Sequence, residues 1–208
     1  QLTEYGLKLV DVLLYDENLF YELLHFTYAT AYDRNPSSYT AISWSYYQIC
    51  DELRRRSPTE FNSARQTIVE AVKRTAEQSR EDALADPGAL STGSLTNFRR
   101  FIRDLDPLVY EDDTGEFSLR SFAPNGLVLA AIDNLYRTDR ESSTREYGTP
   151  LVLSDEVTDY LCTILLVQEE NLTEVIEHVA SMDARLSITP DYEFRVRLTD
   201  PVEINDLA

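Results

Sequence analysis

The feature that most constrains the fold is a basic amphipathic segment followed at once by a predicted β-hairpin. Four apolar residues of segment 94–105 recur at helical spacing and predict a helix with one buried face: Leu95, Phe98, Ile102 and Leu105. Segments 109–111 and 117–120 flank a polar turn that contains Gly115, which predicts a hairpin. A basic helix followed by a hairpin is the second half of a winged helix-turn-helix. The expected fold is therefore mainly α with short β-hairpins, built from winged helix-turn-helix-like units around a helical core.

Positive charge is concentrated around this segment. The whole chain of 208 residues carries a formal charge of −18, whereas residues 53–103 hold ten Lys/Arg against six Asp/Glu. The other residues therefore carry −22. Such segregation in an acidic protein favours contact with nucleic acid. The opposing interpretation is a solvated helix face whose arginines pair with nearby acids.

The basic residues are 17 Arg and only 2 Lys. An acidic excess with almost no Lys is typical of halophilic, chiefly archaeal, organisms that keep molar salt inside the cell, where negative charge keeps a protein surface hydrated. High salt weakens phosphate binding through counterion release. DNA binding in such a setting depends on base-edge contacts and arginine forks.

Candidate DNA contacts fall in three places. Asn suits adenine and Arg suits guanine or phosphate, so the polar face of segment 94–105 comes first. The arginine run before Ser57 is the second place, although arginines there also suit the last turn of a helix through its dipole. The third is an arginine on the second hairpin strand, although acidic residues in the hairpin turn argue against its entry into a DNA groove. The candidate residues are Asn97, Arg99, Arg100, Arg103, Arg120, Arg54, Arg55 and Arg56.

Capping patterns and turns divide the rest of the chain. The predicted cap sites are Thr3, Asp16, Ser57 (with Pro58 at the first helical position and Glu60 completing a capping box), Ser154 and Asn171. A second hairpin is predicted over 186–198. The expected organisation is a helical segment over 1–56, a winged-helix-like unit over 57–136, a polar connector over 137–150 and a helix–hairpin unit over 151–208.

The residue types that bind metals and cofactors form no local motif. Cys50 and Cys162 are far apart, and His25 and His178 are the only histidines, so no zinc site follows from spacing. We expect buried, reduced cysteines, a cytoplasmic protein and no cofactor. No apolar run reaches membrane-spanning length, and we expect no signal peptide and no membrane partner.

Residues 2–9 and residues 122–129 show a weak internal sequence similarity. In winged-helix proteins a segment such as LTxxG leaves the wing and enters the next helix. The first copy is therefore expected to be the tail of an upstream winged helix, and the second copy follows the predicted hairpin.

Four short segments carry a family resemblance: LTEYG at 2–6, YELLHF at 21–26, WSYY at 44–47 and GSLTNF at 93–98. Over residues 2–140 the chain resembles an uncharacterised-domain family encoded beside DNA phosphorothioate-modification genes. The resemblance implies a role in sulfur modification of the DNA backbone or in the linked anti-phage defence, and some members are thought to bind and nick DNA. It transfers no catalytic residue to this chain.

The expected partners are double-stranded DNA and other proteins of a modification or defence complex. One alternative is an assembly subunit without DNA affinity, whose winged-helix units mediate protein contacts. A lesser alternative is a metal-dependent nickase, for which Asp112–Asp113 and Glu169–Glu170 are the adjacent acidic pairs.

Overall fold

A computed structural model describes residues 3–34, 41–78, 90–138, 145–190 and 193–203. These residues are mainly helical, with short antiparallel strands, which confirms the predicted fold class. The chain divides into two compact units: unit 1 is residues 1–20 with 121–208, and unit 2 is residues 21–120. The boundaries between the units follow Phe20 and Arg120, whereas the predicted boundaries were at 56/57 and 136/137. The boundary after Phe20 lies inside helix α2 (Glu17–Arg34), where no turn signal marks it in the sequence.

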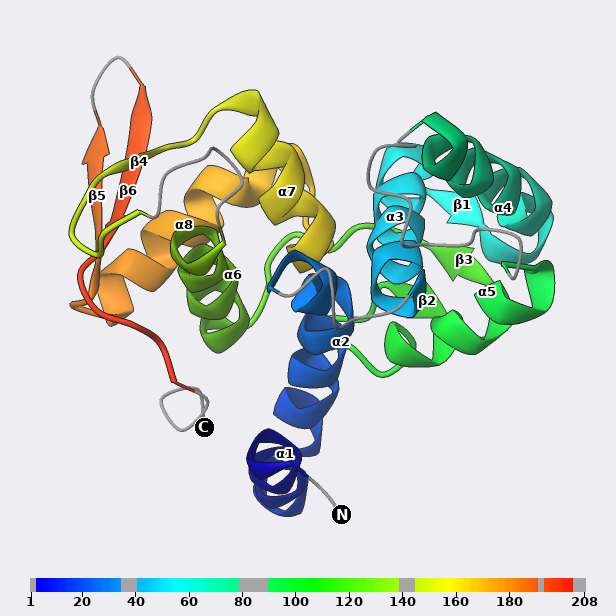
Figure 1. The fold of residues 1–208 in the computed structure, drawn as a ribbon, viewed down its shortest axis with the longest axis horizontal. Helices are drawn as coiled ribbons and strands as arrows, with labels where there is room; N and C mark the ends of the chain where they lie inside the picture. Colours follow the sequence, from blue (N-terminus) through cyan, green and yellow to red (C-terminus); the bar gives the residue numbers. More distant parts are fainter. Residues whose placement is uncertain (1–2, 35–40, 79–89, 139–144, 191–192, 204–208) are drawn as a thin grey trace. The chain divides into compact units, whose positions relative to one another are not determined.

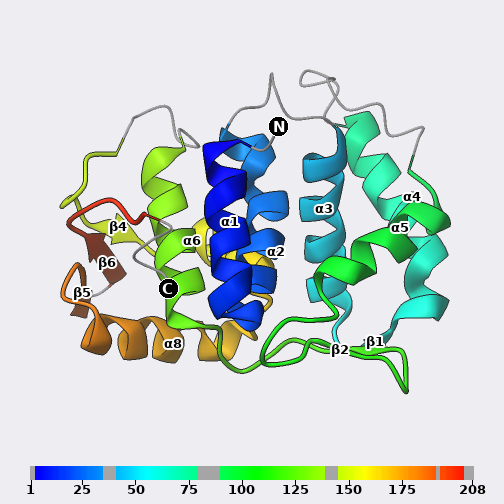
Figure 2. The ribbon, with the colours of Figure 1, turned by 90° about the horizontal axis from the view of Figure 1, so that it is seen from below.

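Unit 2 has the element order of a winged helix. After the second part of α2, its elements are α3 (Ala41–Arg56), β1 (Thr59–Glu60), α4 (Phe61–Gln78), α5 (Thr92–Phe98) with the short 3₁₀ helix η3 (Arg99–Phe101), β2 (Tyr110–Glu111) and β3 (Glu116–Phe117). The strands pair antiparallel in the order β1-β3-β2, with Thr59 and Tyr110 both opposite Phe117. Figure 2 shows this small sheet at the ends of α3 and α4. The predicted hairpin is therefore present as the wing of this unit.

Unit 1 repeats the same order of elements. It begins with α1 (Glu4–Tyr15), and its later elements are α6 (Asn125–Arg137), β4 (Leu151–Val152), α7 (Asp155–Leu165), α8 (Glu169–Met182), β5 (Leu186–Pro190) and β6 (Phe194–Leu198). The strands pair antiparallel in the order β4-β6-β5 (Figure 1). From α6 onward the order of elements is helix, strand, helix, helix, strand, strand. Unit 2 has the same order from α3 onward. The predicted second hairpin is thus the wing of a second winged-helix arrangement.

Buried aromatic and aliphatic side chains fill unit 2. Tyr46 of α3 contacts the rings of Phe98 and Phe101 at 5.6 and 5.5 Å between centroids. His25 is buried, and its Nδ1 lies 2.7 Å from the Tyr46 hydroxyl, so this histidine belongs to the core. Burial raises the pKa of the neighbouring Cys50 thiol to about 12.

The cap predicted at Ser57 is wrong. Thr59 and Glu60 form strand β1, and helix α4 begins only at Phe61. The Glu60 carboxylate accepts hydrogen bonds from the backbone N–H groups of Asn62 and Ser63, both at 2.8 Å, and therefore caps the helix. Ser57 Oγ instead accepts a hydrogen bond from the N–H of Leu119 at 2.9 Å. The strand pairing with β3 decides the backbone here, because it occupies the residues that a cap at Ser57 would need.

Two other helix boundaries differ from the predictions. The helix predicted over 94–105 begins earlier, at Thr92, and ends in the η3 turn, where Ile102 N–H donates to the Arg99 carbonyl at 3.1 Å. Helix α8 begins at Glu169, which puts Asn171 inside its first turn. The caps predicted at Thr3, Asp16 and Ser154 are confirmed, because each side chain accepts a backbone N–H bond three residues downstream.

The described end of the predicted connector packs within unit 1. Tyr147 stacks on Tyr136 with ring centroids 5.3 Å apart, and its hydroxyl donates to Asp133 Oδ1 at 2.8 Å. Burial and then Asp133 raise the pKa of Tyr147 to about 12. Residues 145–150 therefore belong to the folded unit, whereas 139–144 lie outside the described residues.

Candidate nucleic-acid interface

Helix α5 occupies the position of the recognition helix in unit 2. Ser91 and Ser94 form a reciprocal capping box at its start, which satisfies backbone N–H groups that the helix leaves unpaired. Leu95 is fully buried and anchors the inner face of the helix. Arg65 of α4 donates to Thr96 Oγ1 at 3.1 Å and links the two helices of the helix-turn-helix.

Asn97 on α5 and Arg100 in the adjoining η3 turn are exposed candidates. Both side chains point away from the buried face that Leu95 and Ile102 form, as the helical spacing predicts. Among the residues that the structure describes, Arg100 has no hydrogen-bond or ion-pair partner. A guanidinium in that state keeps all five of its N–H donors available to a ligand.

Arg99 has a different environment. Its guanidinium donates to the Tyr110 hydroxyl at 3.0 Å and lies over the Tyr110 ring, 5.2 Å from the centroid. It also lies 6.0 Å from the centroid of Phe61. These contacts connect η3 to the wing strand and to α4, so Arg99 stabilises the arrangement of elements around the candidate surface.

Arg103 is exposed but paired. Its Nε lies 3.2 Å from Asp104 Oδ1 and 3.8 Å from Asp112 Oδ2. The hydrogen bond with Asp104 is the main cause of a raised pKa for Arg103. A phosphate would have to compete with these two carboxylates for the guanidinium.

The arginine run forms the last turn of α3. Arg54 and Arg55 pair with Asp51 at 3.2 and 2.8 Å, and Arg56 pairs with Glu52 at 2.8 Å. Cations in a last helical turn are stabilised by the helix dipole, which was the alternative interpretation of this run. The Arg55 side chain is 59% exposed and is the most accessible of the three.

The prediction that Arg120 is a surface contact is wrong. Its side chain and that of Glu22 on α2 are both 0% exposed. Two N–H groups of Arg120 donate to the two Glu22 carboxylate oxygens at 2.7 and 3.0 Å, and Nη1 also donates to the Asp106 carbonyl at 3.2 Å. A buried guanidinium needs such a partner, and Glu22 lies too far away in the sequence for local pattern to reveal it.

The wing itself carries exposed acids: Glu111, Asp112, Asp113 and Glu116. Carboxylates at these positions repel phosphate. The accessible basic groups of the interface therefore lie elsewhere, in the last turn of α3 and in the η3 turn that follows α5. Sequence reasoning missed Arg65, which is half-buried and hydrogen-bonds to Thr96 of α5. Its place in the helix before the recognition helix is the signal that would have pointed to it.

The two units differ in charge. Unit 2 contains 12 Lys/Arg and 16 Asp/Glu, whereas unit 1 contains 7 and 21. Formal charges are thus −4 for unit 2 and −14 for unit 1. Helices α7 and α8, the helix-turn-helix pair of unit 1, hold seven Asp/Glu and no Lys or Arg. Unit 1 therefore presents no cationic counterpart of α5.

Within the described residues, no group of three or more His, Cys, Asp or Glu side chains is placed to hold a metal ion. The same part of the chain contains no helix with the length and apolar character needed to cross a membrane. Comparisons with protein-family models, curated proteins and solved structures find no match to the chain.

Proposed function

We propose that unit 2 is a duplex-DNA-binding module and that the protein serves a DNA-modification or anti-phage defence system linked to phosphorothioate chemistry. The observation that carries the DNA part is the exposure of Asn97 on α5, the helix that a winged helix places in the major groove, and of Arg100 in the adjoining η3 turn. The link to a modification or defence system rests on the family resemblance of residues 2–140.

Each exposed side chain has a distinct role in this proposal. Asn97 pairs in a bidentate manner with an adenine edge, and Arg100 pairs with guanine or with a phosphate. Arg55, at the end of α3, pairs with Asp51 but is 59% exposed, and it supplies a backbone contact that positions the module without reading sequence. The acidic wing stays outside the groove, because its carboxylates repel the phosphates on either side.

The test is binding of a labelled duplex library across a series of KCl concentrations, compared between the wild type and N97A/R100A. Each good base contact contributes about 1–3 kcal/mol, so the double variant should bind at least about tenfold more weakly. R74A is the matched control, because Arg74 is an exposed arginine of α4 outside the proposed contact. Arg99 is left unchanged, since its loss would disturb the packing of Phe61 and Tyr110.

Equal weakening in R74A and N97A/R100A would show that only general charge matters and would contradict docking through α5. No binding of the wild type at any KCl concentration would contradict DNA binding by unit 2 altogether.

The second candidate function is assembly through unit 1. The carrying observation is the absence of Lys and Arg from α7 and α8 beside their seven carboxylates. A helix-turn-helix with that charge repels DNA, and the same exposed surface is suited to a protein partner with basic side chains. This role does not compete with DNA binding by unit 2, because the two surfaces belong to different units.

A further inference from the structure

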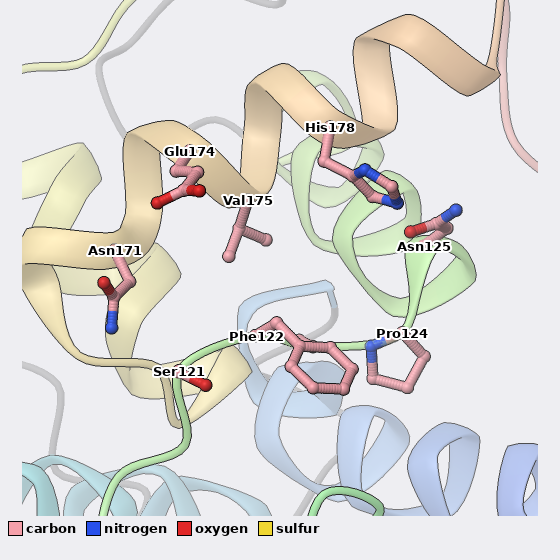
Figure 3. A pocket seen from close by; sticks show the side chains of 9 residues that line it. Ser121, Phe122, Pro124, Asn125, Asn171, Glu174, Val175 and His178 are labelled. Atoms are coloured by element: carbon pink, nitrogen blue, oxygen red, sulfur yellow. The ribbon is translucent and has the colours of Figure 1, made fainter.

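We propose that a groove in unit 1 binds an arginine-bearing peptide segment of a partner protein. The groove has a volume of about 440 Å³ and lies between the segment that enters α6 and the outer side of α8 (Figure 3). Its lining residues are Ser121, Phe122, Ala123, Pro124, Asn125, Asn171, Glu174, Val175 and His178. All of them belong to unit 1, so this inference rests on the assembly role proposed for that unit and does not depend on DNA binding by unit 2.

One side of the groove is apolar. The Phe122 side chain is exposed although it sits beside Pro124, with the residue 56% accessible, and Val175 faces it from α8. Transfer of an exposed phenyl ring from water to a protein contact is favourable by the hydrophobic effect. The ring face also attracts cations, and arginine is the side chain that most often uses this contact.

The other side of the groove supplies negative charge and acceptors. Glu174 and His178 lie one turn apart on α8 and both line the groove. The His178 ring points toward Asn125, and the Glu174 carboxylate lies next to α8 (Figure 3). Neither side chain has a hydrogen-bond or ion-pair partner among the residues that the structure describes. The Glu174 carboxylate is therefore available for a bidentate bond with a guanidinium.

The charge around the groove selects the class of ligand. Glu169, Glu170 and Glu177 share α8 with Glu174, and no Lys or Arg occurs on α7 or α8. Phosphates and acidic peptides are repelled by this field, whereas a cation is attracted. An aromatic face on one side of the groove and a carboxylate on the other suit the planar guanidinium better than the compact ammonium of lysine.

The size of the groove favours a peptide segment. A volume of this order accommodates one long side chain together with an adjacent apolar residue. The apolar lining by Phe122, Pro124 and Val175 would contact that second residue. The expected occupant thus presents an arginine next to a leucine-like residue.

The probe for this proposal is a capped peptide, acetyl-Leu-Arg-Leu-Arg-Leu-amide, titrated into the full chain and followed by calorimetry and by amide chemical shifts. The matched peptide has Glu in place of each Arg. We expect the Arg peptide to bind and to shift amide signals of 121–125 and α8, and the Glu peptide not to bind. E174Q should weaken binding of the Arg peptide about tenfold, the scale of one lost charged hydrogen bond.

Two pairs of variants separate the groove from general attraction to an acidic protein. E177Q removes the same charge from the same helix at a residue that does not line the groove, and it should leave affinity within about twofold. F122A should weaken binding about threefold through loss of the cation–π contact. L108A removes an exposed apolar side chain from unit 2 and should have no effect.

All of these substitutions are at exposed residues, and far-ultraviolet circular dichroism checks that each variant is folded. Equal effects of E174Q and E177Q would overturn the proposal, because they would show non-specific attraction to the helix. Binding of the Glu peptide with similar affinity, or no binding of the Arg peptide at millimolar concentration, would also overturn it.

Discussion

Arg120 and Glu22 show that the neighbours of a residue in the sequence do not predict whether its side chain is buried. Arg120 follows the second hairpin strand and has the sequence context of a wing residue that faces DNA. Its guanidinium is nevertheless buried against Glu22, 98 positions away along the chain. Because the partner comes from α2, only the packing of α2 against the end of the wing determines the role of Arg120.

Replacement of Arg120 by Met should lower the free energy of unfolding by about 3–5 kcal/mol, because the Glu22 carboxylate is then buried without its partner. The double variant E22L/R120M should recover part of this loss, since an apolar pair leaves no buried charge. Urea denaturation followed by circular dichroism measures both changes.

R100M is the control for the Arg120 prediction, and it should change stability by no more than about 0.5 kcal/mol because Arg100 is exposed. A loss for R120M no larger than that of R100M would contradict the stabilising role of the buried pair.

Among the elements, periodicity identified the buried residues of segment 94–105 better than it identified the helix ends, although Phe98 is only half-buried. Leu95, Ile102 and Leu105 are all buried, although the helix ends in the η3 turn before Leu105. The backbone N–H of Asp106 donates to Glu22 Oε1 at 3.0 Å, a tertiary contact that helps to position the chain after η3. The apolar pattern therefore predicts which side chains are buried, while distant contacts decide the backbone that carries them.

Strand β1 is a second element that the local sequence pattern did not predict. The segment 57–60 has the local pattern of a capping box, but two of its residues pair with β3. A strand of two residues has no periodicity of its own, so its position depends on a partner more than 50 residues downstream. The third strand of each sheet was for this reason not predicted.

The cap at Glu60 predicts a pH-dependent contribution to stability. Hydrogen bonds from Ser63 Oγ and from the N–H groups of Asn62 and Ser63 lower the pKa of Glu60 below its usual 4.5. A lowered pKa in the folded state means that the stabilisation is present above the unfolded pKa and is lost as pH falls through the folded pKa. E60Q should therefore destabilise the protein near neutral pH, and its difference from the wild type should shrink as pH falls below 4.5.

Urea denaturation of E60Q and the wild type over this pH range provides the measurement. E77Q is the control, because Glu77 is an exposed acid near the other end of the same helix. A difference between E60Q and the wild type that stays constant with pH would contradict capping by the carboxylate.

In the whole molecule, the two units share one topology but differ in net charge. Both units contain helix, strand, helix, helix, strand and strand in the same order and with the same strand order. Unit 1 carries −14 and unit 2 carries −4, so the same architecture presents two electrostatically different surfaces. This difference is the basis for assigning the proposed DNA contact to unit 2 and the proposed peptide contact to unit 1.

The net charge of −18 predicts stabilisation by salt. Like charges repel one another in the compact state, and salt screens this repulsion. An increase in KCl from about 0.1 to about 2 M should raise the Tm by about 5 °C, the effect of about 1–2 kcal/mol in a chain of this size. Differential scanning calorimetry measures the shift.

The same KCl series at a pH close to the isoelectric point of about 4.4 is the control, because little net charge is left to screen there. A Tm that does not respond to KCl near neutral pH would contradict both the repulsion and the halophilic interpretation of the composition.

Neighbouring residues and composition are enough to predict several features of this protein. These are the mainly helical fold, the caps at Thr3, Asp16 and Ser154, the wing hairpins and the outward positions of Asn97 and Arg100. Four other features follow from contacts between distant segments: the two unit boundaries, the third strand of each sheet, the burial of Arg120 and the groove beside Phe122. Helical periodicity and turn chemistry act over a few residues, whereas strand pairing and ion-pair burial join segments that become neighbours only when the chain is folded.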